Sequence, residues 1–303
     1  MHARRSGRPE TCPPTARGAP TRVYGEAVMA ISLVAPERRR AVARPARFRE
    51  PGSPTAVVGH MGAPLAATPN TTAAFLAANE LGADGIELDL IAVEPGRVIV
   101  AHDLGDARAR PDALVLETLE HVLAEPPLSR VPVLLDVKSP GAERALAAAL
   151  VGARLTPRAI ISTTDPSVLR GLARTVPQAT RSLTYPRSQR DPDRHALSRT
   201  LATWKRPILR ATLPAIVRRA NLRHELHAVT VEERLVTPAL RKITEKLGIE
   251  LIVWTVDDAE RARELLELDV DAIITNDPAL VLRLRDEHLA REAGIRRTAV
   301  GGW

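Results

Sequence analysis

Apolar, strand-like runs alternate with helical stretches along most of this chain, and this alternation most restricts what it can fold into. Strands that alternate with helices pair in parallel through right-handed crossovers. About eight such units in roughly 250 residues predict an α/β fold, a closed (β/α)8 TIM barrel, with an open doubly wound sheet as the alternative. The strand-like runs cover residues 56–60, 85–91, 97–102, 131–138, 159–164, 180–185, 227–231, 249–256 and 271–276.

The helical stretches between these runs carry recognisable boundary signals. The segment "DPSVLRGLARTVP" opens with Asp165 as a capping residue and Pro166 in the first turn, and repeats apolar residues at helical spacing. The segment "NTTAAFLAANELG" ends in Gly82, a residue that commonly terminates helices. No glycine-rich phosphate loop follows the first strand, because "GHMGAP" is neither a P-loop nor a dinucleotide-binding motif.

Residues 1–55 differ in composition from the rest of the chain. They contain eleven arginines and four glutamates, whereas residues 56–303 contain 32 basic and 32 acidic residues. This first segment is rich in proline and arginine and lacks periodicity, so we expect a disordered leader over 1–55 and the barrel over 56–303. Because the whole net charge of +7 comes from the leader, the barrel has no net field to attract nucleic acid.

The composition also restricts the compartment. No run reaches the roughly 18 apolar residues of a membrane-spanning helix, and the short "AVMAISLVA" run is followed by "PERRR" without a small-residue cleavage site. A single cysteine, Cys12, excludes an internal disulfide. We therefore expect a cytoplasmic protein without stable membrane insertion.

Ionisable residues occur at or near the ends of several strand-like runs. The run "VVGH" ends in His60, and "GIELDL" carries Glu87 and Asp89. Residues two apart in a strand project to the same side, so these two carboxylates share a face. An acidic pair inside an apolar strand is costly unless a cation or another partner neutralises it.

The next two runs add three more such residues. "VIVAH" ends in His102, placed as His60 is, and "VLLDVK" carries Asp136 and Lys138 on one face. Carboxylate oxygens are the ligands that Ca²⁺ and Mg²⁺ prefer, and two histidines can divide acid and base roles near neutral pH. A lysine can hold a phosphate oxygen. The set suggests metal-dependent phosphodiester cleavage, and the alternative is a group of salt bridges at strand ends.

Longer stretches resemble the glycerophosphodiester phosphodiesterase family. "VVGHMGAP…TPNTTAAFLAANELGADGIELDL…VIVAHD" resembles its HRG, PENT, GAD-IELDV and HD motifs. "PVLLDVKS" resembles its acidic-x-Lys strand, and "IELIVWTVDDAERARELLELDVDAIITNDP" its closing WTVN…GVDGIITDRP segment. The resemblance covers roughly residues 56–285 and implies a barrel enzyme that releases glycerol 3-phosphate and an alcohol through attack of the neighbouring glycerol hydroxyl on phosphorus.

The resemblance also implies roles for individual residues. It makes His60 and His102 the acid/base pair, without saying which is the acid. It makes Trp254 a wall of the substrate site, although core packing would equally explain a tryptophan at the end of a strand. The metal ligands that it implies, for Ca²⁺ or Mg²⁺, are Glu87, Asp89 and Asp136.

Three positions depart from the family pattern. Met61 replaces the arginine of HRG, Pro69 replaces the glutamate of PENT, and Asp136 replaces the usual glutamate ligand. The segment after His102 is also short and leaves little room for a cap over the site. The alternative function is thus a catalytically impaired barrel that binds a phosphorylated ligand without turnover. The head group of the glycerophosphodiester or lysophospholipid substrate, the cation and the oligomeric state stay open.

Overall fold

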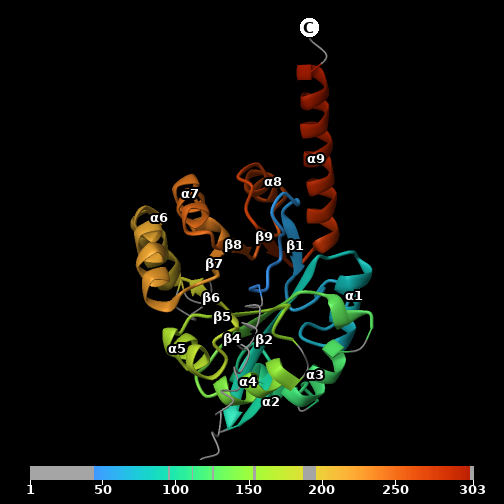
Figure 1. The fold of residues 1–303 in the computed structure, drawn as a ribbon, viewed down its shortest axis with the longest axis vertical. Coiled ribbons are helices and arrows are strands. Elements are labelled where there is room, and N and C mark those ends of the chain that lie inside the picture. The colour runs from blue at the N-terminus through green and yellow to red at the C-terminus, as the bar shows by residue number, and fades with distance from the viewer. Residues whose placement is uncertain are drawn as a thin grey trace, which may run out of the picture. The chain divides into compact units, whose positions relative to one another are not determined.

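The computed structural model describes the chain from residue 44 to residue 300 with five internal gaps (Figure 1). Residues 1–43, most of the predicted leader, lie outside the described residues. The described ranges are 44–94, 96–110, 112–124, 126–152, 155–186 and 196–300.

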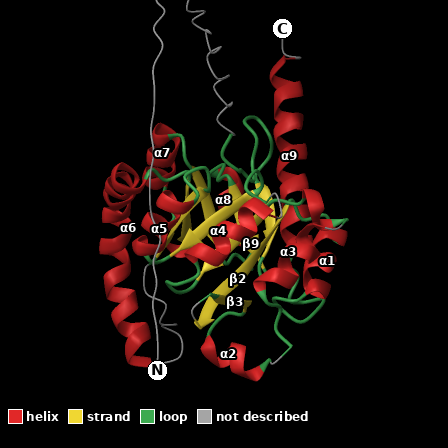
Figure 2. Cartoon of the chain, turned by 60° about the horizontal axis from the view of Figure 1, so that its bottom comes forward, coloured by secondary structure: helices red, strands yellow, loops and turns green. Residues whose placement is uncertain are grey.

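Eight parallel strands close into a barrel. The closure is made by β1, which pairs in parallel with both β2 and β9. Figure 2 shows the strands at the centre with helices around them. The predicted TIM barrel is therefore confirmed, and the open doubly wound sheet is excluded. The barrel strands are β1 (Ala56–Gly59), β2 (Gly85–Glu94), β4 (Val133–Val137), β5 (Ala159–Thr163), β6 (Thr180–Tyr185), β7 (Ala228–Glu232), β8 (Glu250–Trp254) and β9 (Ala272–Thr275).

The helices begin and end at the signals read from the sequence. Asp165 caps α5 by accepting a hydrogen bond from the Ser167 amide at 2.8 Å, and Gly82 follows α1 with a left-handed φ of 86°. The helices are α1 (Thr72–Glu80), α2 (Leu104–Ala109), α3 (Leu116–Ala124), α4 (Glu143–Gly152), α5 (Pro166–Thr175), α6 (Ala196–His224), α7 (Pro238–Leu247), α8 (Ala259–Glu267) and α9 (Pro278–Val300), with short 3-10 turns η1 (Leu128–Arg130) and η3 (Glu233–Leu235). No helix in the described part of the chain is long and apolar enough to cross a membrane.

The third predicted strand is real but is not part of the barrel. β3 (Arg97–Val100) runs antiparallel to β2 and forms a hairpin with its far end. In this register Leu90 lies opposite Val100, so the hairpin returns the chain to the level of Asp89. The prediction that His102 ends a barrel strand as His60 does is therefore wrong. An apolar four-residue run looks the same in a parallel and in an antiparallel pair.

Residues 44–55, here called the strap, pack against the N-terminal ends of the barrel strands. The ring of Phe48 is buried and lies against Gly85, where a Cβ atom would come within 2.3 Å of the ring. The amide of Phe48 donates to the carboxylate of Glu250 at 3.2 Å, and the amide of Ala46 donates to Thr180 Oγ1 at 2.6 Å. The expected leader is thus wrong in its last twelve residues, because the strap closes the barrel floor.

Candidate active site

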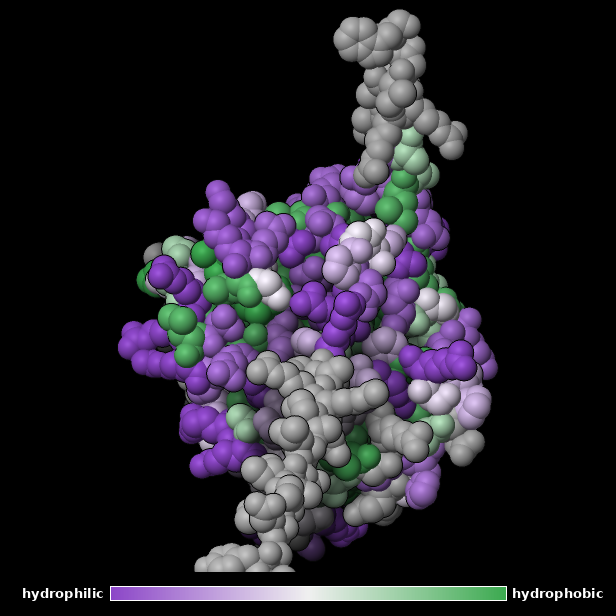
Figure 3. All heavy atoms as spheres, in the orientation of Figure 1, coloured by the Kyte–Doolittle hydropathy of each residue, from purple (hydrophilic) through white to green (hydrophobic). Residues whose placement is uncertain are grey.

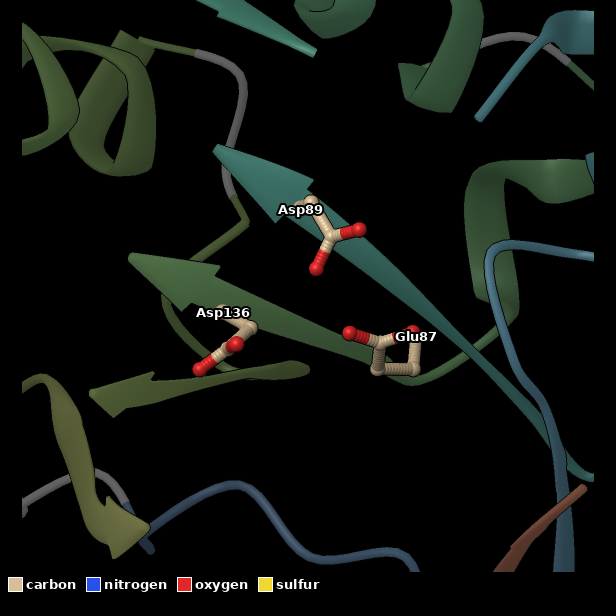
Figure 4. Close-up of side chains that lie close together, drawn as sticks. All are labelled: Glu87, Asp89 and Asp136. Atoms are coloured by element: carbon tan, nitrogen blue, oxygen red, sulfur yellow. The ribbon is translucent and has the colours of Figure 1, made fainter. Parts of the chain in front are cut away.

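Three carboxylates meet on the inner face of the barrel (Figure 4). Glu87 and Asp89 lie two residues apart on β2 and therefore share one face of the strand. Asp136 lies beside Asp89 in the parallel register of β4. One oxygen from each lies within 4.8 Å of the other two. Glu87 and Asp89 are buried and Asp136 is partly buried. Hard oxygen donors at this spacing suit a cation such as Ca²⁺ or Mg²⁺.

Lys138 is the cation that the structure places among these carboxylates. Its Nζ lies 2.6 Å from Asp89 Oδ1 and 2.5 Å from Asp136 Oδ2. Burial alone would lower the pKa of Lys138, but Asp136 and Asp89 raise it well above its usual range, so the ammonium stays charged. Lys138 thus neutralises one of the three carboxylates.

Burial and the neighbouring charges shift the pKa values of the three carboxyl groups. Burial, followed by the charge of Asp89, raises the pKa of Glu87 well above its usual value. Burial also raises the pKa of Asp136. For Asp89 burial acts in the same direction, but Lys138 outweighs it and lowers the pKa. Three carboxylates against one ammonium leave two negative charges, which a divalent cation would neutralise. The donor set therefore fits a divalent cation.

Asn70 holds the Asp89 carboxylate from the opposite side. It is buried and has a left-handed φ of 58°, a conformation that asparagine tolerates better than most residues. Its Nδ2 donates to Asp89 Oδ2 at 3.0 Å, and its Oδ1 accepts from the Asp89 amide at 3.1 Å. This double contact fixes the direction of the carboxylate. The sequence analysis missed Asn70, which lies in the "TPNT" motif.

The two glycines near His60 allow a tight turn after β1. A Cβ atom on Gly59 would come within 2.2 Å of the Gly62 carbonyl oxygen, and one on Gly62 would come within 2.5 Å of the Ala74 backbone. In this turn Met61 adopts a φ of 49°, and its amide donates to Glu87 Oε2 at 3.0 Å. The "GHMG" turn therefore directs a backbone donor at the acidic cluster and places His60 beside it.

A chain of polar contacts orients the His60 ring. Asp257 Oδ2 accepts from Asn276 Nδ2 at 2.6 Å, and Asp257 Oδ1 accepts from the Asn276 amide at 2.8 Å. This places Asn276 Oδ1 towards His60 Nδ1, 2.8 Å away. An amide oxygen only accepts, so Nδ1 carries a proton and donates it. Asp257 and Asn276 were not predicted as site residues, because a contact between strand ends has no local signal.

The other ring nitrogen of His60 faces the acidic cluster. Its Nε2 lies 3.9 Å from Glu87 Oε2. Burial lowers the pKa of His60, and the hydrogen bond to Asn276 offsets part of this effect. In the neutral ring with Nδ1 protonated, Nε2 has a lone pair and can accept a proton.

His102 lies in a more open position. Its side chain is 57% exposed, and its Nδ1 lies 3.5 Å from Asp103 Oδ2. Its amide donates to Asp106 Oδ2 at 2.9 Å, which holds the start of α2 against the hairpin. His102 makes only a minor contribution to the pKa values of Asp89 and Asp136, on which burial has the largest effect. It thus lies at the edge of the acidic cluster rather than inside it.

Trp254 lies at the end of β8, with its ring against the apolar barrel interior. The buried Nε1–H of this ring has no acceptor among the described residues. A buried donor of this kind usually has a partner, so a bound molecule at the rim is a candidate acceptor. Of the seven predicted site residues, the structure brings five close together: Glu87, Asp89, Asp136, Lys138 and His60.

Comparison with known proteins identifies relatives of this chain. The model of the glycerophosphoryl diester phosphodiesterase family matches residues 131–280, which include Asp136, Lys138 and Trp254. A glycerophosphodiester phosphodiesterase from Caldanaerobacter subterraneus subsp. tengcongensis is 27% identical over 261 residues, which are 76% of this chain and 97% of that protein. The match extends over nearly all of the relative.

Solved structures agree with the barrel fold. The glycerophosphodiester phosphodiesterase of Parabacteroides distasonis superposes with a TM-score of 0.61 at 17% identity, covering 78% of this chain and 98% of that one. A phosphodiesterase of Oleispira antarctica, solved in complex with the product sn-glycerol-3-phosphate, gives a TM-score of 0.58 at 15% identity and covers 77% and 97%. At these identities the likeness establishes the fold.

Proposed function

Since this chain belongs to the glycerophosphoryl diester phosphodiesterase family, a family of phosphoric diester hydrolases, we propose that it hydrolyses glycerophosphodiesters to glycerol 3-phosphate and an alcohol. The observation that carries this proposal is the group of three carboxylates within 4.8 Å of one another beside the unprotonated nitrogen of His60. Glycerophosphodiesters and the head groups of lysophospholipids present the same glycerol phosphate unit to such a site.

We assign the cation to Glu87, Asp89 and Asp136. When bound there, Ca²⁺ or Mg²⁺ supplies positive charge beside the substrate phosphate. The protein's own residues prepare this place: Asn70 orients Asp89, the Met61 amide orients Glu87, and Lys138 joins Asp89 to Asp136. Because Lys138 already contacts two carboxylates, its first role is to hold the cluster; binding a phosphate oxygen is a second role.

The two histidines divide the proton transfers. His60 Nε2 accepts the proton of the glycerol hydroxyl next to the phosphodiester as that oxygen bonds to phosphorus. The phosphorus–alcohol bond breaks, and His102 donates a proton to the departing alcohol oxygen. Water then opens the cyclic phosphate with the two roles reversed. The contact with Asn276 favours His60 as the first base, and the exposure of His102 beside Asp103 suits the leaving-group side.

The proposal is tested with purified full-length protein and glycerophosphocholine. We expect glycerol 3-phosphate to form in the presence of Ca²⁺ or Mg²⁺ and to stop forming after chelation. Tight binding of glycerol 3-phosphate without any turnover would contradict the proposal and identify the impaired barrel instead. Glycerophosphoethanolamine and a lysophospholipid, assayed in parallel, identify the preferred alcohol.

A further inference from the structure

The outer face of α6 exposes apolar side chains in a line. Ile208 and Leu222 are 67% and 76% exposed, and Ala215 is exposed between them. The three are spaced seven residues apart, so they lie on one side of the helix. The opposite side, with Leu213 and Val217, is buried in the core. The apolar line is therefore separate from the face that packs on the barrel.

The same helix has only basic charges. Between Ala196 and His224 the sequence contains no aspartate or glutamate. Acidic residues on the segments next to α6 have partners of their own: Glu225 lies 3.6 Å from Arg181, Glu233 lies 3.1 Å from Arg261, and Glu245 lies 3.4 Å from Arg241. The barrel as a whole has no net charge, so this helix is a local concentration of positive charge. Its arginines with described side chains are Arg206, Arg210, Arg218, Arg219 and Arg223.

A groove between α6 and α7 extends the apolar line. It has a volume of about 500 Å³, and its walls include Ala215, Arg218, Leu222 and Ile243. Figure 3 shows hydrophobic side chains over α6 and α7, bordered by hydrophilic ones. We call this surface, made of the exposed side of α6 and the Ile243 side of α7, the α6 patch.

We propose that the α6 patch binds the surface of a membrane rich in anionic lipid. Exposed apolar side chains enter the boundary between head groups and acyl chains, while arginines on both sides of them contact lipid phosphates. The helix lies on such a surface and does not cross it. This proposal concerns a surface outside the active site and does not depend on the proposed function.

Two other occupants fit the patch less well. Single-stranded nucleic acid is bound through aromatic side chains that stack on bases, and none of the described side chains of the patch is aromatic. A second copy of the chain would place arginines such as Arg218 and Arg219 against the same arginines, because a twofold interface pairs a surface with itself. An anionic membrane has dense negative charge at its surface and an apolar layer beneath it, so it matches both the arginines and the exposed apolar side chains of the α6 patch.

The test uses full-length protein and sedimentation with vesicles of phosphatidylcholine, alone or mixed with phosphatidylglycerol. We expect binding to the mixed vesicles only. The variant Arg218→Glu/Arg219→Glu should bind at least about tenfold more weakly, because each basic residue near an anionic surface contributes about fivefold. Its control is Arg170→Glu/Arg174→Glu on α5, which makes the same change in net charge at exposed positions and should bind as the native chain does.

A second pair of variants tests the apolar contribution. Ile208→Ser/Leu222→Ser should weaken binding, whereas Val151→Ser, at a 61% exposed position on α4, should not. Turnover of soluble glycerophosphocholine should be unchanged in all four variants. Equal loss in the α5 control, tighter binding of single-stranded DNA than of vesicles, or a dimer that Leu222→Ser dissociates would each overturn the proposal.

Discussion

The side-chain oxygen of Asn276 contacts Nδ1 of His60 at 2.8 Å, and this contact decides which nitrogen of the ring faces the carboxylates. Asp257 accepts a hydrogen bond from the side-chain nitrogen of Asn276 and so directs the amide oxygen towards His60. The two residues therefore position the His60 ring.

Exchange of these two partners tests the positioning role. Asp257→Asn and Asn276→Asp should each reduce kcat by about tenfold or more, with a smaller effect on KM, because the His60 ring loses its fixed orientation. The double exchange should recover most of the activity, since an asparagine at 257 can donate to an aspartate at 276. Steady-state kinetics of all three variants measure this, with Asp258→Asn as the control. A double variant no better than the singles would contradict the role.

Loss of either proton-transferring residue should be costly for turnover. His60→Ala and His102→Ala should each reduce turnover of glycerophosphocholine at least about 10²-fold, because a positioned acid or base contributes about 10²–10⁴-fold. Circular dichroism should show normal folding, and His121→Ala, on the exposed side of α3, should retain full activity. A folded His60 or His102 variant with near-native turnover would show that the residue is structural.

The acidic cluster predicts a dependence on divalent cations. Glu87→Ala and Asp89→Ala should each abolish activation by Ca²⁺ or Mg²⁺, because each removes one of three charged donors. Calorimetric titration of the cation measures this directly, and Glu80→Ala, an exposed carboxylate on α1, serves as the control. Undiminished cation binding in both cluster variants would exclude the metal site.

The strap predicts a sharp limit to N-terminal truncation. Removal of residues 1–43 should leave the unfolding temperature nearly unchanged, whereas removal of 1–55 should lower it strongly, because the second deletion uncovers Gly85 and removes the donors to Glu250. Phe48→Ala should cost about 3 kcal/mol of unfolding free energy, as for other large core truncations. Thermal unfolding of the two truncations and denaturant unfolding of Phe48→Ala measure these effects; equal stability of the two truncations would show that the strap is dispensable.

The raised pKa of Glu250 predicts that the free energy of unfolding falls as the pH rises. Burial raises the pKa of Glu250 from its usual value of 4.5 to about 7. Between these two values the folded protein binds a proton that the unfolded chain has lost, so the free energy of unfolding decreases from about pH 4.5 to about pH 7. The loss is at most about 3 kcal/mol. Glu250→Gln should remove this part of the pH dependence, as denaturant titrations at pH 5 and 8 would show.

The sequence predicted the barrel because its determinants are local. Most barrel strands are short apolar runs. Glu87 and Asp89 are two apart in such a run, so they were placed on one face correctly. The direction of β3 was not predictable in this way, because the run at 97–100 has no feature that separates an antiparallel from a parallel partner.

The residues that orient the site have no comparable local signal in the sequence. Asn70 and Asn276 lie in loops, where an asparagine is most often read as a turn or capping residue. Their partners are distant in sequence: Asp89 for Asn70 and His60 for Asn276. The strap was missed for a related reason, since Phe48 is the one aromatic residue of 44–55 and the sequence around it is rich in proline and arginine.

The strap also imposes an order on biosynthesis. Its contacts join Ala46 to Thr180, 134 residues later, and Phe48 to Glu250, 202 residues later. On the ribosome, the first described segment to be made must therefore wait for the last quarter of the chain before it finds its partners. Until then the floor of the nascent barrel is uncovered, so this floor closes only late in synthesis.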